Sequence, residues 1–457
     1  MRPAIAPLAL LLALGSTPAL AQSASVWGSS STFLRGFVRP ADSGVATYLP
    51  FFEQVELHGR RLGFEGLSVH AGLWGMVDLV DLQDRYRASG DVSTLYLEYR
   101  APTEGRWRAL RGLEIAGGRQ FVALGPTILE QVDGGKLHYV HPSGLELGIF
   151  GGAPTGTRVA YQLWPTDEDR YNYGYSWLIG GRLGFINFGH MAAGITVVHR
   201  RYRGRVADND LGLDLSYAPL SWLDVSASAV LSVEAMRAKE VKGGVSLQPL
   251  RALSFHLGYR YTSPDLYIPR TSIFAVFADS SFQEASIDAR WQVTRALSLD
   301  ADYGRRFYLA RGGESTPDQS DGANRATLRA TLRFGQSRDG RALAEVERVE
   351  SPDNAANRVR LATSVPFWLL SRQFAVIADL DFFVLDEPIR ETRTSFIASG
   401  YLAVPLVSSS KLRLLAGGSG GVTPLLDSAG SFLVRLVWDF EAPVADDGVQ
   451  VQRGRLP

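Results

Sequence analysis

Apolar and polar residues alternate with a period of two along most of this chain. From residue 253 to residue 262, for example, Leu, Phe, Leu, Tyr and Tyr alternate with Ser, His, Gly, Arg and Thr. This alternation is typical of a β-strand whose two faces meet different environments. It predicts strands rather than helices over most of residues 50 to 440.

The same pattern returns in many segments of roughly ten residues, the length at which a tilted strand crosses a bilayer. Clear examples lie at residues 94–100, 211–217, 223–231, 285–291, 297–303, 325–334 and 373–382. A water-soluble β-sandwich would alternate too, but its strands are usually five or six residues long. Aromatic residues such as Tyr217, Trp291 and Trp438 end several segments, as they do at membrane interfaces. Length and aromatic placement therefore favour a membrane barrel.

The predicted fold is all-β: a large antiparallel transmembrane β-barrel of about 18–22 strands, with short periplasmic turns and longer extracellular loops. Short connections with a shared composition are the predicted turns, at residues 218–223, 248–253, 294–297, 365–369 and 404–406. Longer polar connections at Arg311–Ala323, Ser351–Ala355 and Leu385–Thr392 are the predicted loops. The stretch from Leu110 to Tyr175 gives the weakest assignment of strands.

Both ends of the chain differ from this pattern. Arg2, the apolar run Leu8–Leu14 and the small-residue site Ala19-Leu20-Ala21 predict a signal peptide over residues 1–21. Its apolar run is too short for a membrane anchor. The barrel is then expected at residues 22–440. The polar residues 441–457 are expected to form a periplasmic C-terminal tail.

The last alternating segment has Phe432, Val434, Leu436, Trp438 and Phe440 on one face. It resembles the C-terminal strand that the barrel-assembly machinery recognises in bacterial outer-membrane proteins. In those proteins the aromatic residue is commonly the last one, whereas here 17 residues follow Phe440. Over nearly its whole length the chain resembles porin-like outer-membrane barrels. This resemblance implies the outer membrane of a Gram-negative bacterium, in contact with membrane lipid and lipopolysaccharide.

The composition narrows the chemistry. The 47 basic and 47 acidic residues cancel, so nothing indicates a nucleic-acid partner. Cysteine is absent, and the seven histidines are scattered outside any catalytic motif. His138 and His141 lie three residues apart, a spacing that is incidental in a strand-and-turn context. We expect no cofactor, no metal site and no enzymatic activity.

The polar face of a closed barrel in lipid must enclose the lumen, because the apolar face has to meet hydrocarbon. At this strand number the lumen is too wide for side chains alone and is expected to hold water or folded-in loops. The candidate pore-lining residues are Arg260, Arg290, Arg325, Arg329, Arg333, Arg358, Arg360, Asp214, Asp224, Asp300, Asp302, Asp379 and Asp381. They suggest a passive channel for small hydrophilic solutes. Five of the arginines fall on nearby strands and the aspartates fall elsewhere, which predicts opposed charged walls; these arginines are Arg325, Arg329, Arg333, Arg358 and Arg360. Alternatively, the charges only solvate the interior.

The connection from Ser263 to Ser280 is unusually apolar for an outer loop. It could fold inward as a constriction formed by Arg270, Phe274 and Phe277, or it could pack on the barrel rim.

A second hypothesis is a conduit that exports a polysaccharide with periplasmic partners, or a sheath around an electron-carrying partner. Gly118-Arg119-Gln120 followed by Asp133-Gly134 resembles a motif of barrels that export acidic polysaccharide. Arginines along the wall would suit such an anionic chain. A barrel enzyme is a less favoured third reading.

Overall fold

The protein is described from a computed structural model. It covers residues 25–41, 44–61, 65–80, 88–102, 110–155, 176–202, 205–266, 281–309, 322–335, 337–351, 354–407, 411–424 and 426–441. The predicted signal peptide, almost all of the predicted tail, and Arg270, Phe274 and Phe277 of the predicted constriction loop lie outside these residues.

The described chain is almost entirely β-strand. The strands are β1 (Ser25–Ala41), β2 (Gly44–Tyr48), β3 (Pro50–Arg60), β4 (Leu67–Asp78), β5 (Ala88–Arg100), β6 (Leu113–Leu124), β7 (Ile128–Val140), β8 (Leu145–Pro154), β9 (Trp177–Phe188), β10 (Met191–Tyr202), β11 (Arg205–Leu220), β12 (Leu223–Ser232), β13 (Arg237–Leu250), β14 (Leu253–Thr262), β15 (Phe282–Gln292), β16 (Leu297–Tyr308), β17 (Ala323–Phe334), β18 (Gly340–Glu350), β19 (Ala355–Leu369), β20 (Arg372–Ile389), β21 (Thr392–Pro405), β22 (Leu412–Thr423) and β23 (Leu426–Glu441). A single turn of 3-10 helix, Pro264–Leu266, follows β14. No helix in the described ranges is long and apolar enough to cross a bilayer.

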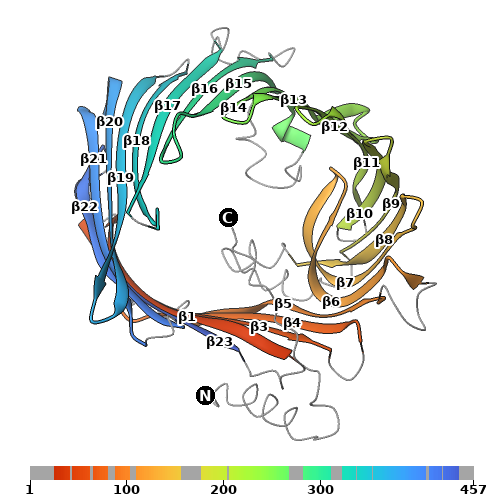
Figure 1. Cartoon of the computed structure of the whole chain (residues 1–457), viewed down its shortest axis with the longest axis horizontal. Coiled ribbons are helices and arrows are strands. Elements are labelled where there is room, and N and C mark those ends of the chain that lie inside the picture. Colours follow the sequence, from red (N-terminus) through yellow and green to blue (C-terminus); the bar gives the residue numbers. More distant parts are fainter. Residues whose placement is uncertain are drawn as a thin grey trace, which may run out of the picture.

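The strands form a closed antiparallel barrel (Figure 1). Strand β1 pairs with β3 on one side and with the last strand, β23, on the other, where Trp27 lies opposite Glu441. Strands β2 and β3 meet β1 in one continuous register and are separated only by Leu49, so they act as one strand. The barrel therefore has 22 strands, which confirms the predicted fold class at the upper end of its range. Closure leaves no unpaired sheet edge in the membrane.

The two rims are named from the chain ends. The terminal rim carries Ser25 and Glu441, and the distal rim lies at the other end of the strands. The five predicted short turns all lie at the terminal rim, where two-residue turns such as Ser221–Trp222 and Arg251–Ala252 join neighbouring strands. One of them is misplaced by a few residues: residues 365–369 belong to β19, and the turn follows at Leu370 and Ser371.

One predicted loop is wrong. The segment Leu385–Thr392 is mostly strand, because β20 continues to Ile389 and turns at Arg390 and Glu391 alone. Both turn residues have positive φ, 50° and 68°, as a tight hairpin requires. The usual Asn-Gly signal for this geometry is absent, which is why the sequence suggested a longer loop.

Exposed apolar side chains lie on the outer surface of strands all around the ring. Leu328 on β17 is 58% exposed and Leu213 on β11 is 40% exposed, because no other part of the described chain covers them. Fully buried apolar side chains are few in the described chain, and six of them form one cluster around β6 to β10. A barrel whose apolar face contacts lipid needs no larger core, because the lipid covers its apolar side chains.

Candidate functional site: the barrel interior and its inward hairpin

The hairpin of β6 and β7 leaves the wall and enters the barrel. Pairing between β5 and β6 stops at Leu95 and Arg119, and pairing between β7 and β8 stops at Val132 and Pro154. The pairing of β6 with β7 continues beyond these points to Leu124 and Ile128. Figure 1 shows the tip of this hairpin inside the ring, next to β9–β11.

Paired glycines mark the place where the hairpin bends. Gly117 and Gly118 on β6 lie opposite Gly135 and Gly134 on β7, and these lie opposite Gly151 and Gly152 on β8. A Cβ atom at Gly134 would lie 2.0 Å from the carbonyl oxygen of Gly151. Gly118 has a φ of +125°, which side chains rarely adopt. Three neighbouring strands therefore approach closely enough to bend only because they lack side chains here.

A dry contact holds the hairpin against the wall. One buried cluster joins the hairpin to the wall: Val122, Leu124 and Val132 of the hairpin and Phe150, Leu178 and Val198 of the wall, none of them more than 6% exposed. The turn residue Thr127 packs over Gly212 of β11, where a Cβ atom would be 2.4 Å away. Burying this apolar surface favours the inward position, because the wall side chains would otherwise face an aqueous lumen.

Charged groups fix the tip of the hairpin. Glu130 of β7 accepts a hydrogen bond from Arg200 of β10 at 3.2 Å, and Arg200 also binds Asp210 at 2.7 Å. The Lys239 ammonium, which is 2% exposed, binds Asp208 and Asp210 in the same network. Removing one of the two cations, Arg200 or Lys239, would leave buried carboxylates without part of the positive charge that stabilises them.

The residues of the Gly118-Arg119-Gln120 and Asp133-Gly134 motif occupy the base of the hairpin. Arg119 makes two hydrogen bonds to Asp133, at 2.6 and 2.7 Å, and a third to Asp91 at 3.0 Å. Gln120 is buried and donates to the carbonyl of Gly134. The motif thus ties β6, β7 and the start of β5 together where the sheet bends.

The hairpin also identifies the inner face of the wall. Arg200, Thr196 and Gly212 contact the hairpin, so their side of the sheet faces the lumen. Directly paired residues share a face, and the register carries this assignment from strand to strand. It places every candidate pore-lining residue on the inner face, from Asp214 on β11 to Asp379 and Asp381 on β20.

The predicted separation of charge into opposed walls is wrong. Arg358 binds Asp381 at 2.7 Å, and Arg360 hydrogen-bonds Asp379 at 3.1 Å, although these aspartates were assigned to the other wall. Arg329 hydrogen-bonds Glu345 at 2.6 Å, and Arg290 pairs with Asp300. Residues that are far apart in sequence become neighbours on adjacent strands, so the charges form a mixed ladder.

The remaining candidates have fewer ionic contacts. Arg260 pairs with Glu240 at 2.8 Å, and Asp214 pairs with Arg182 at 2.6 Å. Arg325 comes within 3.8 Å of Asp302. Among the described residues, Arg333 and Asp224 have no recorded ion pair, and Arg333 lies opposite Arg341 on β18.

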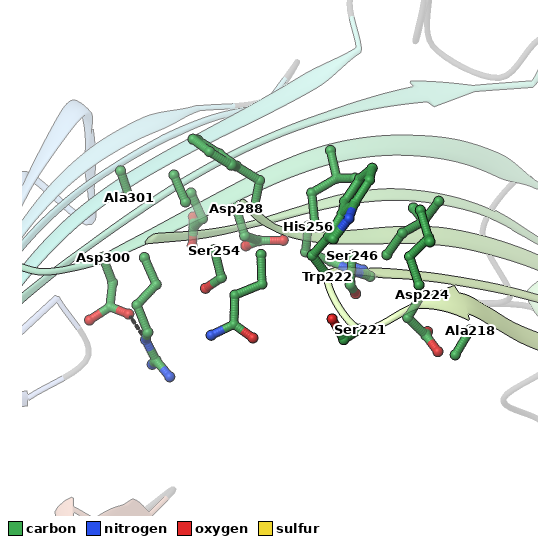
Figure 2. Close-up of a pocket in the computed structure, with 18 of the residues that line it drawn as sticks. Ala218, Ser221, Trp222, Asp224, Ser246, Ser254, His256, Asp288, Asp300 and Ala301 are labelled. Carbon is green, nitrogen blue, oxygen red and sulfur yellow. Dashed lines mark hydrogen bonds and ion pairs between the residues drawn. The ribbon is translucent and has the colours of Figure 1, made fainter. Parts of the chain in front are cut away.

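A hollow of about 740 Å³ lies in the inner wall near the terminal rim (Figure 2). Its lining includes Asp224, Asp288, Asp300, Asp302 and His256, on strands β12 and β14–β16. Asp288 lies directly opposite Asp302, whose Oδ2 is buried and accepts no hydrogen bond from the described residues. Among the candidate carboxylates, Asp224 and Asp302 of this hollow have the weakest ionic contacts with described residues.

His138 and His141, three residues apart in the sequence, contact different partners. His138 Nε2 lies 2.9 Å from Glu146 Oε1, and His141 Nδ1 lies 2.8 Å from Ser143 Oγ. No cluster of three potential metal-binding side chains occurs within the part of the chain that the structure describes.

The sequence did not reveal the hairpin or its partners Glu130, Arg200 and Lys239. A signal was present: apolar Val122, Leu124 and Phe150 stand on the face that is polar elsewhere. The doubled glycines recur at matching places in β6, β7 and β8.

The comparisons with known proteins concern the fold. No protein-family model and no curated protein matches this chain. The E. coli P pilus tip assembly intermediate PapC-PapD-PapK-PapG contains a chain that is 10% identical, with a TM-score of 0.50 over 93% of this chain and 62% of that one. The Acinetobacter baumannii protein OccAB4 is 8% identical, with a TM-score of 0.45 over 93% and 100% of the two chains. The Pseudomonas aeruginosa outer-membrane protein opdK is also 8% identical, with a TM-score of 0.44 over the same shares.

This chain has the fold of a bacterial outer-membrane β-barrel. At such identities the likeness extends to the fold and no further. The roles of individual inner-face residues have to be argued from their own contacts.

Proposed function

We propose that this protein is an outer-membrane channel for small hydrophilic solutes and that the β6–β7 hairpin is its constriction. The observation that carries the proposal is a hairpin held inside a closed 22-stranded barrel by a glycine bend, a dry contact and the Arg200–Glu130 pair. A 22-stranded barrel has a lumen far wider than a small solute, so an element inside it sets the passage.

The free face of the hairpin would meet the solute. Phe121 alternates with the buried Gln120 and Val122 and is 58% exposed, so it points away from the supporting wall. The opposite side of the barrel carries the Arg358–Asp381 and Arg360–Asp379 pairs. A solute would thus pass between an apolar edge and a ladder of fixed charges of both signs, which suits small polar molecules over a bulk apolar cargo.

Conductance in planar bilayers tests this proposal. Residues 122–130 are replaced by Asn-Gly, which closes β6 and β7 with a two-residue turn at Phe121 and Gln131. The single-channel conductance should increase because the obstruction is gone. A matched variant replaces residues 385–393, an equal length at the distal end of β20 and β21, by Asn-Gly and should conduct like the wild type.

Two results would overturn the proposal in different ways. A pure wild-type preparation that inserts but gives no conductance steps rejects an open channel. An unchanged conductance in the hairpin variant, with correct folding shown by its mobility in unheated gel samples, rejects the hairpin as the constriction.

The conduit for an exported polysaccharide is not favoured by a further observation. The motif that suggested it is occupied with holding the hairpin base, through Arg119, Asp133 and Asp91. Three of the arginines that were expected to attract an anionic chain, Arg329, Arg358 and Arg360, are paired with neighbouring carboxylates.

A further inference from the structure

Two arginines on the outer face of the barrel differ from the arginines of the lumen. Arg201 on β10 lies with its guanidinium 5.8 Å from the centre of the Trp177 ring, and Arg305 on β16 lies 5.0 Å from that of Phe307. Both arginines are exposed, and neither has a recorded ion pair with any described residue. The inner-face arginines Arg182, Arg329 and Arg358, by contrast, all bind carboxylates.

The register places both arginines on the lipid-facing side of the wall. Arg201 follows Ile195 and Val197 at every second position of β10, and these two residues are 50% and 54% exposed. Arg305 shares its face with Tyr303 and Phe307, which are 43% and 45% exposed. The inner positions of β16 are instead taken by Asp300, Asp302 and Arg306, whose contacts run along the ladder.

Both arginines also lie at the same end of the barrel. Arg201 is one residue from the end of β10, and Arg305 is three residues from the end of β16. These strand ends belong to the distal rim. Trp177 lies beside Arg201, and its ring centre is 5.2 Å from that of His199; Phe307 lies beside Arg305, with Tyr303 on the same face of β16. Aromatic side chains of this kind gather where hydrocarbon gives way to lipid headgroups.

A cation–π contact of this kind supplies no oxygen acceptor, so the N–H groups of the guanidinium stay available for one. At a membrane interface those donors need an anionic or polar partner. Phosphate is the partner whose geometry fits a guanidinium best, because two parallel N–H groups can bind two of its oxygens. The side chain also reaches the headgroup level while its methylene stem stays in apolar surroundings.

We propose that Arg201 and Arg305, each in cation–π contact with an aromatic ring at the distal rim, bind the phosphate groups of the outer-leaflet lipid, of the lipid A type. The proposal rests on the outer-membrane location and on the distal rim facing outward, and it is independent of whether the lumen conducts. The two sites lie on β10 and β16, so they would hold lipid at separate places around the barrel.

Arg348 supplies a matched control. It is also an outer-face arginine near the distal end of its strand, β18, but it already hydrogen-bonds Asp386 at 2.7 Å and Glu350 at 3.2 Å. Its guanidinium edge is therefore occupied. Removing it changes the net charge of the rim by the same amount without removing a free phosphate-binding edge.

The test measures the thermal unfolding midpoint of the detergent-solubilised full barrel as lipid A is added. The wild type should unfold at a higher temperature with lipid A, and less so with lipid A whose phosphates have been removed. Each of Arg201→Gln and Arg305→Gln should weaken the apparent affinity by about tenfold, the worth of one charge-assisted contact. Arg348→Gln should retain the wild-type response. Inorganic phosphate alone should give no shift, because the aromatic surroundings favour a lipid-borne phosphate.

The proposal is overturned if the double variant Arg201→Gln/Arg305→Gln responds to lipid A as the wild type does, or if Arg348→Gln loses the response equally. A shift with inorganic phosphate as large as that with lipid A would assign the site to a soluble anion and would also overturn it. Conductance of the double variant separates this result from the channel, because both residues face away from the lumen and should leave the conductance unchanged.

Discussion

The inner face of the barrel wall is stabilised differently on two sides of the barrel. On the side of β6 to β11, a second layer covers the wall, and the contact between layers is apolar at Phe150 and Leu178 and ionic at Arg200. On the side of β15 to β20, no second layer of described residues covers the wall, and its charges pair with each other in a ladder such as Arg358–Asp381. The first side is built like the core of a soluble protein, and the second like a solvated surface. The same type of residue should therefore matter more on the first side.

The largest effect is expected from one methyl group added at the glycine bend of the β6–β7 hairpin. Gly134→Ala places a Cβ atom against the Gly151 backbone, which cannot move aside without separating β7 from β8. We expect a loss of more than about 4 kcal/mol or failure to fold, as for severe backbone clashes. Gly135→Ala is the matched control, because its Cβ atom would lie at an ordinary 3.6 Å from the nearest atom. Urea unfolding in lipid vesicles measures both; equal stability of the two variants would refute the tight bend.

Loosening the contact between the layers should have the next largest effect. Phe150→Ala removes the largest side chain of the buried cluster and leaves a cavity between hairpin and wall, at a cost of about 3–5 kcal/mol. It should also make the single-channel current noisier, since the hairpin is less firmly held. Phe382→Ala, on the outer face of β20, also removes a ring but should leave the current trace as it is. A quiet trace from Phe150→Ala would mean that the hairpin does not depend on this contact.

Ion pairs on the two sides can be compared directly. Arg200→Ala removes the cation bound to Glu130 and leaves Asp210 with Lys239 alone, and we expect a loss of about 2 kcal/mol. Arg290→Ala removes a side chain that is 67% exposed, and the expected loss is below about 1 kcal/mol. Unfolding midpoints of the two variants give the difference. Losses of the same size would show that the hairpin tip is no better shielded than the open wall.

Substitutions in the ladder of ion pairs between β19 and β20 should have the smallest effect on stability. They should still change the ion selectivity measurably. Arg358→Gln combined with Arg360→Gln leaves Asp381 and Asp379 without their nearest cations. Stability should fall by about 1 kcal/mol or less, because these side chains are only partly buried and border the lumen. The lumen should become more cation-selective, which the zero-current potential across a salt gradient measures. A shift toward anions, or none, would place these residues away from the path of the ions.

The barrel itself could be predicted because alternation is a local property. Segments such as 253–262 and 325–334 place apolar side chains on one face wherever the strands end up, and the leader and terminal aromatic strand indicated the membrane. The strand number could be bounded but not set, because the stretch from Leu110 to Tyr175 does not follow the common pattern. Its irregularity has a structural reason: one half of each of β6 and β7 pairs with the neighbouring wall strands, and the other half lies inside the barrel.

The pairing of charges could not be predicted, because it depends on register. Arg358 and Asp381 are 23 residues apart, and only the turn at Leu370 and Ser371 brings β19 and β20 into the register that joins them. Without that register, the arginines and aspartates seemed to form separate groups. The same limit applies to Arg200 and Glu130, which are 70 residues apart.

The amino-acid sequence alone determined that this chain is a lipid-facing barrel, because a two-residue period is written into each strand independently of its neighbours. The closed tertiary structure decided what the barrel encloses. Whether a hairpin stays in the wall or turns inward depends on glycines from three strands meeting at one place, and whether a charge is free or neutralised depends on the strand beside it. Both are properties of neighbours in space, and these neighbours exist only once the ring has closed.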